Sequence, residues 1–235
     1  MVNPILVALD VSDLARAERL AKSLDGYVGG FKVGLELLMG EGPESVSRIA
    51  EFGLPVFADA KLHDIPNTTE RAARRLAARG ARWITAHATG GSRMIEAAAS
   101  GLTAGSEGRK VGVLAVTVLT SLDQTDLETL GVSNSVRTQS VELARMARRA
   151  GAEGVICSPS EVVSVKALSP EFLAVTPGIR PVGSAHGDQK RTSTPVEALR
   201  AGADFIVVGR AITEAADPVA SASSIVESLR AAALL

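Results

Sequence analysis

Two carboxylates and one ammonium group lie close together in the stretch Asp59-Ala-Lys61-Leu-His-Asp64. The apolar run before it, Leu54-Pro-Val-Phe-Ala, predicts a buried strand, and the side chains of a strand alternate between its two faces. Asp59 and Lys61 should therefore point the same way at the end of that strand. Carboxylate and ammonium groups held together are typical of acid–base and electrostatic catalysis. The structural alternative is an ion pair together with a helix cap at Asp64.

An arginine near the end of the chain predicts an anion site. The expected strand Phe205–Val208 runs directly into Gly209 and Arg210, at the start of a short helical turn expected over Ala211–Ala215. Backbone N–H groups at a helix start favour an anion, and a guanidinium can add a two-pronged contact. This position therefore indicates a phosphorylated ligand.

A second lysine, Lys32, lies inside an expected strand over Gly30–Gly34 and shares its face with two glycines. Burying a charged group is costly unless it is paired, so a buried Lys32 would need a partner. The alternative is a lysine that extends its charged end to the rim of the fold. Asp10 ends the first expected strand and is not needed as a helix cap, because Ser12 or Asp13 could cap the next helix.

Polar groups also follow two later strands. The hydroxyl groups of Thr120 and Ser121 come after the fifth expected strand, where they could bind a ligand or merely cap a turn. After the seventh expected strand, a long loop from Thr176 to Arg191 contains Arg180 and Gln189. Long loops at such a place are often lids over a binding site.

The order of the predicted elements indicates how these groups come together. Short apolar runs alternate with stretches of helical spacing, which predicts an α/β fold, a (β/α)8 TIM barrel, as one domain over residues 1–235. In such a barrel the active site lies at the C-terminal ends of the strands. The main alternative, a doubly wound open sheet, would usually carry a glycine-rich turn where this chain has Leu9-Asp10-Val-Ser-Asp. The expected strands are Ile5–Leu9, Gly30–Gly34, Pro55–Ala60, Trp83–Ala86, Val111–Leu119, Gly154–Cys157, Phe172–Thr176 and Phe205–Val208. The expected helices are Leu14–Leu24, Ser45–Phe52, Asn67–Arg79, Met94–Leu102, Val141–Ala150, Ser160–Leu168, Pro195–Ala201 and Pro218–Leu229, with Pro66 and Asp217 near the starts of two of them.

Composition limits the classes of partner. A net charge of −1 and a pI near 6.3 give no sign of a nucleic-acid or anionic-membrane partner, and 3% aromatic residues argue against base-stacking platforms. The sequence holds no apolar run long enough for a membrane span, and its start lacks the pattern of a secretory signal. The single cysteine, Cys157, cannot form an internal disulfide and suits a reducing compartment. We therefore expect a cytoplasmic protein.

Three other kinds of site lack support in the sequence. His63, His87 and His186 are widely spaced, without the paired spacing of zinc ligands. Cys157 ends an expected strand and fits a small core residue better than a nucleophile. The chain has no G-x-S-x-G serine elbow.

Together these residues resemble the orotidine 5′-phosphate decarboxylase family. The pattern Asp59-x-Lys61-x-x-Asp64-Ile-Pro-Asn-Thr68 is a specific signature, and the resemblance covers the whole chain in order. The resemblance implies a TIM-barrel homodimer that converts orotidine 5′-monophosphate to UMP and CO₂, the last step of pyrimidine nucleotide synthesis, without cofactor or metal. The other matching positions are Asp10, Lys32, Thr117-Val-Leu-Thr120-Ser121, Pro177-Gly-Ile-Arg180, Gln189 and Gly209-Arg210.

The resemblance also implies a role for each residue of the charged group. Lys61 would donate a proton to C6 of the pyrimidine, and Asp59 would lie beside the substrate carboxylate. Lys32 and Asp10 would hold the ribose hydroxyls and complete a row of alternating charge. The flanking carboxylates should keep Lys61 in its charged form.

The remaining positions are implied to hold the two ends of the nucleotide. Asp64 and Thr68 would reach into the active site of the neighbouring subunit, so that each site is shared across the dimer interface. Thr120, with or without Ser121, would contact the pyrimidine. The phosphate would be bound by Arg180, Gln189, Gly209 and Arg210.

Two other functions share part of this pattern. Hexulose-phosphate synthases and keto-gulonate-phosphate decarboxylases also carry D-x-K-x-x-D and a phosphate site, but they use Mg²⁺ and typically place an acidic residue where Lys32 stands. Lys32, the Ile-Pro-Asn-Thr68 segment and the long Arg180–Gln189 loop favour the orotidylate decarboxylase. A non-catalytic phosphosugar-binding protein would need the phosphate groups but not the row of charges.

Overall fold

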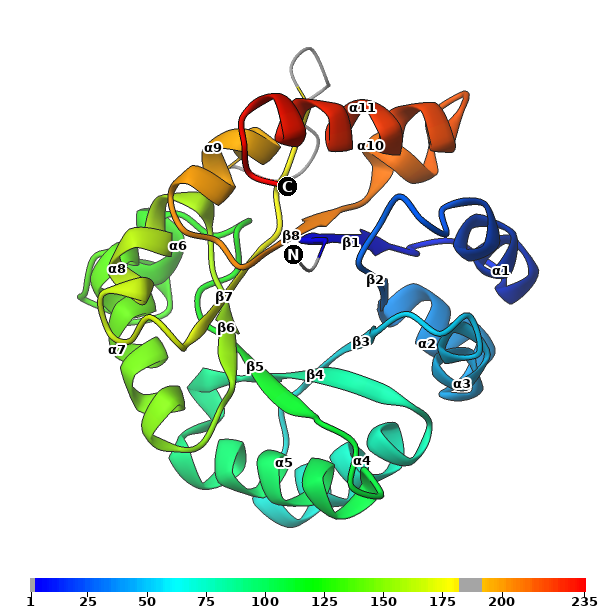
Figure 1. Cartoon of the computed structure of the whole chain (residues 1–235). Helices are drawn as coiled ribbons and strands as arrows, with labels where there is room; N and C mark the ends of the chain where they lie inside the picture. The colour runs from blue at the N-terminus through cyan, green and yellow to red at the C-terminus, as the bar shows by residue number, and fades with distance from the viewer. Residues whose placement is uncertain (1–2, 182–191) are drawn as a thin grey trace.

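In a computed structural model, eight parallel strands close into a barrel in which β8 pairs with β1 (Figure 1). The structure describes residues 3–181 and 192–235. The helices form a ring around the outside of the strands (Figure 1). The predicted (β/α)8 barrel is therefore confirmed. The strands are β1 (Ile5–Ala8), β2 (Gly30–Val33), β3 (Val56–Leu62), β4 (Ala81–His87), β5 (Gly112–Val116), β6 (Gly154–Ile156), β7 (Leu173–Thr176) and β8 (Phe205–Val208).

Helices occupy the connections between successive strands and follow β8. Two of them, α2 and α6, were not predicted, because segments this short show too little periodicity to be recognised. A capping box at Asp123 and Asp126 is the one local signal that could have revealed α6. The α-helices are α1 (Leu14–Ser23), α2 (Leu35–Glu41), α3 (Glu44–Ala50), α4 (Pro66–Ala78), α5 (Ser92–Gly105), α6 (Gln124–Thr129), α7 (Val136–Arg149), α8 (Val162–Lys166), α9 (Pro195–Arg200), α10 (Arg210–Thr213) and α11 (Pro218–Ala231), with 3-10 helices η1 (Ala88–Gly90) and η2 (Pro159–Glu161).

The fifth strand is shorter than predicted. The apolar run suggested Val111–Leu119, but β5 ends at Val116. Val118 and Leu119 continue the apolar pattern beyond the strand, but they line a cavity at its end and do not pair with a neighbouring strand. Binding cavities are lined mainly by apolar side chains, so the apolar run does not mark the end of the strand.

Alternation along the strands divides the core into two layers. One set of strand residues packs outward against the helices in a large cluster that includes Val7, Phe31 and Ile84. The other set fills the barrel in a smaller cluster that includes Leu6, Phe57, Trp83, Leu114, Val175 and Val207. Most of the strands are therefore apolar on both faces, as is typical of strands covered by helices. The charged exceptions are β2 and the end of β3, which carry Lys32 and Asp59 among their buried residues.

Local signals start α1, α4 and α11 at or within one residue of the predicted places, whereas α7 begins at Val136, five residues before the predicted Val141. Asp13 caps α1 by accepting a hydrogen bond of 2.8 Å from the backbone N–H of Arg16, so the cap does not use Asp10. Pro66 begins α4 and Pro218 begins α11, where a missing N–H costs nothing. None of the helices in the described part of the chain is long and apolar enough to cross a membrane.

A partly buried polar cluster holds the N-terminal end of the barrel. Glu153, directly before β6, accepts hydrogen bonds of 2.6 and 2.7 Å from Arg82 and one of 2.8 Å from the Trp83 indole. The Arg82 guanidinium also lies 4.4 Å from the centre of the Trp83 ring. Burial alone would raise the pKa of Glu153, but the bonds and charge of Arg82 outweigh it and hold that pKa below its usual value. The cluster joins β4 to β6 at the end of the barrel that usually serves stability.

We predict that Glu153→Gln lowers the free energy of unfolding at neutral pH by about 1.5–3 kcal/mol, because Arg82 loses a charged acceptor. Since the folded-state pKa of Glu153 is lowered, its contribution is present at neutral pH and is lost as the pH falls through that pKa. The difference between the variant and the parent should therefore shrink in acid. Urea unfolding at neutral and at acidic pH measures this difference in the free energy of unfolding.

Glu142→Gln is the matched control, because Glu142 pairs with Arg145 on the exposed face of α7. Exposed pairs of this kind contribute little. Equal losses in both variants would contradict a stabilising role for the Glu153 cluster.

Candidate active site

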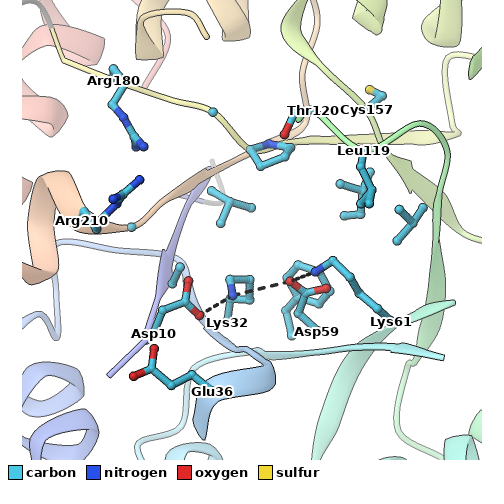
Figure 2. Close-up of a pocket in the computed structure, with 18 of the residues that line it drawn as sticks. Asp10, Lys32, Glu36, Asp59, Lys61, Leu119, Thr120, Cys157, Arg180 and Arg210 are labelled. Carbon is cyan, nitrogen blue, oxygen red and sulfur yellow. Dashed lines mark hydrogen bonds and ion pairs between the residues drawn. The ribbon is translucent and has the colours of Figure 1, made fainter. Parts of the chain in front are cut away.

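A cavity of about 460 Å³ opens at the C-terminal ends of the strands. Its wall combines a charged side from β1 to β3 with an apolar side from β5 and β6 (Figure 2). Eight of the predicted site residues line it: Asp10, Lys32, Asp59, Lys61, Thr120, Arg180, Gly209 and Arg210.

Four of these side chains form a continuous row of alternating charge (Figure 2). The ammonium of Lys32 donates to Asp10 Oδ1 at 2.7 Å and lies 3.5 Å from Asp59 Oδ2. The ammonium of Lys61 donates to the same Oδ2 of Asp59 at 2.7 Å. The Lys32 side chain is 10% exposed, so this lysine is buried and paired and does not extend to the rim.

Asp59 is the buried centre of the row. Its side chain is 10% exposed, and burial alone would raise its pKa. The Lys32 and Lys61 ammonium groups, with a hydrogen bond from Thr85, outweigh that effect and hold the pKa of Asp59 below its usual value. The carboxylate is therefore ionised at neutral pH and lies directly beside both ammonium groups.

Lys61 reaches this position through an irregularity in β3. Simple alternation predicts that Asp59 and Lys61 share a face, yet the backbone of Lys61 has φ 46°, in the left-handed region that residues other than glycine rarely adopt. Ala58 pairs with Ile84 and Leu62 with Ala86, so three residues of β3 stand opposite one residue of β4. This bulge turns the end of the strand and directs Lys61 into the cavity.

Thr85 is the residue of β4 that faces the bulge, and sequence reasoning missed it. Its side chain is fully buried. The hydroxyl accepts a bond of 2.8 Å from the backbone N–H of Lys61 and donates one of 2.8 Å to Asp59 Oδ1. Threonine is common inside strands, so its residue type alone did not indicate a role. Its place two residues after the inward-facing Trp83 is the one feature that predicts a side chain pointing into the barrel.

Gly34 permits the close approach of Asp10 and Lys32. It lies directly after β2, on the face predicted for Lys32. A Cβ at this position would stand 2.3 Å from Asp10 Oδ1 and 2.6 Å from the Lys32 ammonium, closer than any real Cβ contact. The row of charge therefore requires a residue without a side chain here.

Two arginines occupy the far end of the cavity from Lys61. Arg180 comes from the segment after β7 and Arg210 from the first residue of α10, and their guanidinium groups extend toward one another (Figure 2). Gly209 is the residue before α10, as predicted. Gln189 lies outside the described residues. Two cations facing one space form a fitting site for a phosphate.

The loop after β5 supplies one of its two candidate hydroxyls. Thr120 lines the cavity, whereas Ser121 is exposed and does not border the cavity. Glu36 on α2 and Glu214 after α10 also line the cavity and were not predicted. Glu36 lies on the helix that the sequence did not reveal, and nothing in the sequence distinguishes Glu214 from an ordinary surface residue.

Asp64 and Thr68 lie outside this cavity. Both are exposed, and Ile65 between them is 67% exposed. Asp64 does not cap α4: its carboxylate accepts a bond of 2.6 Å from the N–H of Ile65, and Ile65 is the residue that precedes the helix. The structural alternative of a helix cap at Asp64 is therefore wrong.

Among the described residues, His63, His87 and Cys157 form no separate catalytic group, and His186 lies outside those residues. His63 and His87 stack with their ring centres 5.3 Å apart beside Lys61, and burial, followed by the charges of His63 and Lys61, holds the pKa of His87 below its usual value. Cys157 is buried in the cavity wall. Within residues 3–181 and 192–235, no cluster of three or more His, Cys, Asp or Glu side chains could hold a metal ion.

Comparison with known proteins gives one consistent result. The profile of the "Orotidine 5'-phosphate decarboxylase / HUMPS family" matches residues 3–225. Proteins named orotidine 5′-phosphate decarboxylase from Anaeromyxobacter sp. (strain K) and Paramagnetospirillum magneticum are 51% and 48% identical, each over 96% of this chain and 97% of the relative. A crystal structure of the Lactobacillus acidophilus protein of the same name superposes with a TM-score of 0.85 at 38% identity, covering 96% of this chain and 98% of that one.

The charge row predicts how Asp59 responds when one ammonium is lost. Lys32→Met keeps a side chain of similar length but no charge, so the pKa of Asp59 should rise, because burial would then be opposed mainly by Lys61. Titration of the aspartate carboxyl signals by ¹³C NMR measures it. Asp204, which pairs with Lys166 at 2.8 Å elsewhere in the fold, is the internal control and should not move. An unchanged Asp59 titration would contradict the electrostatic coupling of the row.

Proposed function

This chain belongs to the orotidine 5′-phosphate decarboxylase / HUMPS family, and we propose that it converts orotidine 5′-monophosphate to UMP and CO₂ in pyrimidine nucleotide synthesis. The observation that carries the proposal is the row of charge Asp10–Lys32–Asp59–Lys61, with Lys32 and Asp59 buried at its centre, facing two arginines across one cavity. A phosphosugar-binding protein would need the arginines alone. The relatives that share about half of this sequence carry the decarboxylase name, which favours this activity over the magnesium-dependent alternative.

The cavity suggests one orientation for the nucleotide. The phosphate lies between Arg180 and Arg210 near Gly209, where guanidinium forks and the start of α10 offer donors. The ribose hydroxyls meet Asp10 and Lys32. With the phosphate and ribose so placed, the pyrimidine extends toward Thr120 and the C6 carboxylate toward Asp59 and Lys61.

The chemical step needs a cation and a proton at the same place. When the bond between C6 and the carboxylate breaks, CO₂ leaves and the electron pair stays on C6 in the plane of the ring. The Lys61 ammonium stabilises that charge and transfers its proton to C6, which leaves a neutral amine that regains a proton from water. Before this step, the ionised Asp59 carboxylate holds the Lys61 ammonium in place through the 2.7 Å contact at Oδ2. The ionised Asp59 also repels the substrate carboxylate that lies beside it, which raises the energy of the ground state.

Phosphate binding supports this step from a distance. Arg180 and Arg210 contact a part of the substrate that does not react. Binding energy from such a remote group can be used to orient the reacting group and to exclude water. Arg180 and Arg210 therefore contribute to catalysis as well as to affinity.

We further propose a cytoplasmic homodimer with shared active sites. Asp64, Ile65 and Thr68 lie past the end of β3 with exposed side chains that do not border the cavity of their own chain. The exposed Ile65 between Asp64 and Thr68 gives this segment both apolar and polar groups for contact with a partner. We propose that this segment inserts into the active-site cavity of a second copy of this chain.

We predict that Lys61→Ala keeps its fold and binds nucleotide but loses nearly all turnover of orotidine 5′-monophosphate. Loss of one pre-organised transition-state donor costs at least about 10²-fold, and here the proton donor is lost as well. Lys22→Ala, an exposed lysine on α1, is the control and should match the parent. A folded Lys61→Ala protein with turnover within about tenfold of the parent would exclude Lys61 as the proton donor.

Arg210→Ala should weaken phosphate-dependent binding, so KM for the nucleotide rises steeply. Activity on the nucleoside orotidine, which has no phosphate, should barely change. The control is Arg230→Ala, an exposed arginine on α11. Steady-state kinetics on both substrates distinguish the outcomes: equal losses on both would make Arg210 a structural residue.

Mixing two inactive variants tests the shared site. Lys61→Ala and Asp64→Ala homodimers each carry two damaged sites. After the two are unfolded and refolded together, about half of the dimers should be mixed, and each mixed dimer has one site with both residues intact. Activity should therefore return to about a quarter of wild type. If mixing restores nothing although subunit exchange is demonstrated, Asp64 serves its own chain.

A further inference from the structure

We infer that Thr85 is a positioning residue for the reaction: its hydroxyl holds the Asp59 carboxylate and the Lys61 backbone in one fixed arrangement. The inference rests on the proposed function for its kinetic test. Thr85 lies on β4, where it is hydrogen-bonded to Asp59, and it does not border the cavity. It therefore makes no contact with the reacting atoms. It acts only through Asp59 and Lys61.

The bulge in β3 explains why a side chain is needed here. Three residues of β3 face one residue of β4, so the N–H of Lys61 is displaced from the regular ladder of backbone bonds. The Thr85 hydroxyl accepts this N–H at 2.8 Å, in the place where a regular ladder would offer a carbonyl. An unpaired buried N–H would be costly, and the left-handed backbone of Lys61 persists only where its surroundings hold it.

The same hydroxyl sets the orientation of Asp59. A hydroxyl that accepts the Lys61 N–H still has one proton to donate, and an ionised carboxylate can only accept. The bond of 2.8 Å to Asp59 Oδ1 is therefore directed from Thr85 to Asp59. With Oδ1 so occupied, Oδ2 is the oxygen that faces Lys61 at 2.7 Å and Lys32 at 3.5 Å.

A single buried hydroxyl thus links the two groups that must lie on either side of the scissile bond. If it is removed, Asp59 can rotate about its side chain and Lys61 can relax its backbone, although the charges remain. Misplacing a reacting group by about 1 Å can cost on the order of 10²-fold in rate. The contacts of the substrate's phosphate lie at the other end of the cavity, so binding should change much less.

Thr85→Val tests the inference, because valine keeps the shape of threonine and removes the hydroxyl. We expect kcat to fall by roughly 10- to 100-fold, with little change in KM. The acid limb of the kcat/KM profile should move to higher pH, because the ionised Asp59 loses a hydrogen bond that lowers its pKa. Lys32, Lys61 and His87, the other groups that Asp59 faces, are unchanged in the variant.

Two variants control for a merely structural effect. Thr85→Ser keeps the hydroxyl and should retain most of the activity and the parental acid limb. Thr176→Val removes another fully buried hydroxyl, which among the described residues has no hydrogen-bond partner, and should match the parent. Thr85→Ala replaces Thr85→Val if the valine protein does not fold. Two results would overturn the inference: unchanged kcat and acid limb in the variant without a hydroxyl, or a loss in Thr85→Ser as large as in Thr85→Val.

A measurement without substrate separates this inference from the proposed function. Titration of the Asp59 carboxyl by ¹³C NMR should show a higher pKa in Thr85→Val than in the parent and in Thr176→Val. If the parent does not turn over orotidine 5′-monophosphate, the proposed function fails, whereas the titration still tests the link between Thr85 and Asp59. An active parent whose Asp59 titrates identically in Thr85→Val would contradict the inference alone.

Discussion

The ionised carboxylate of Asp59, buried between two ammonium groups, is the interaction on which the site depends. Burial of a lone charge would cost more than the fold could supply, so each charge in the row requires its neighbour. Asp10 pairs with Lys32, Lys32 lies near Asp59, and Asp59 pairs with Lys61. The row ends with Lys61 at the cavity, where a cation can act on a substrate.

The barrel makes this arrangement possible because neighbouring strands bring residues from distant parts of the chain to one rim. Asp10, Lys32 and Asp59 come from the ends of β1 to β3, which are hydrogen-bonded neighbours. The exceptional features lie at the same rim: the left-handed backbone of Lys61, the bulge opposite Thr85 and the missing side chain at Gly34. Each of these features is locally unfavourable for the backbone and serves to position a charged group, a combination typical of functional sites.

Sequence reasoning found the fold and most of the charged residues because the signals were local. Apolar runs and helical spacing predict the barrel, and polar residues at strand ends predict the rim. Thr85 was not predicted, because its contacts depend on a bulge in the neighbouring strand β3. The alternation of side chains along β4 alone does not indicate that bulge. The helix α2 with Glu36 was missed because it is short. The proposal that subunits share sites rests on the family resemblance, and exposed Asp64 and Thr68 are compatible with it.

The most direct test of the central claim is an assay of the purified protein with orotidine 5′-monophosphate after treatment with EDTA. Loss of orotidylate absorbance, with UMP and CO₂ identified as products, should proceed at the same rate with and without the chelator. A Lys61→Ala preparation made in parallel excludes a contaminating enzyme from the host. Failure of the parent protein to form UMP, or a requirement for added Mg²⁺, would contradict a decarboxylation carried out by the row of side chains that ends at Lys61.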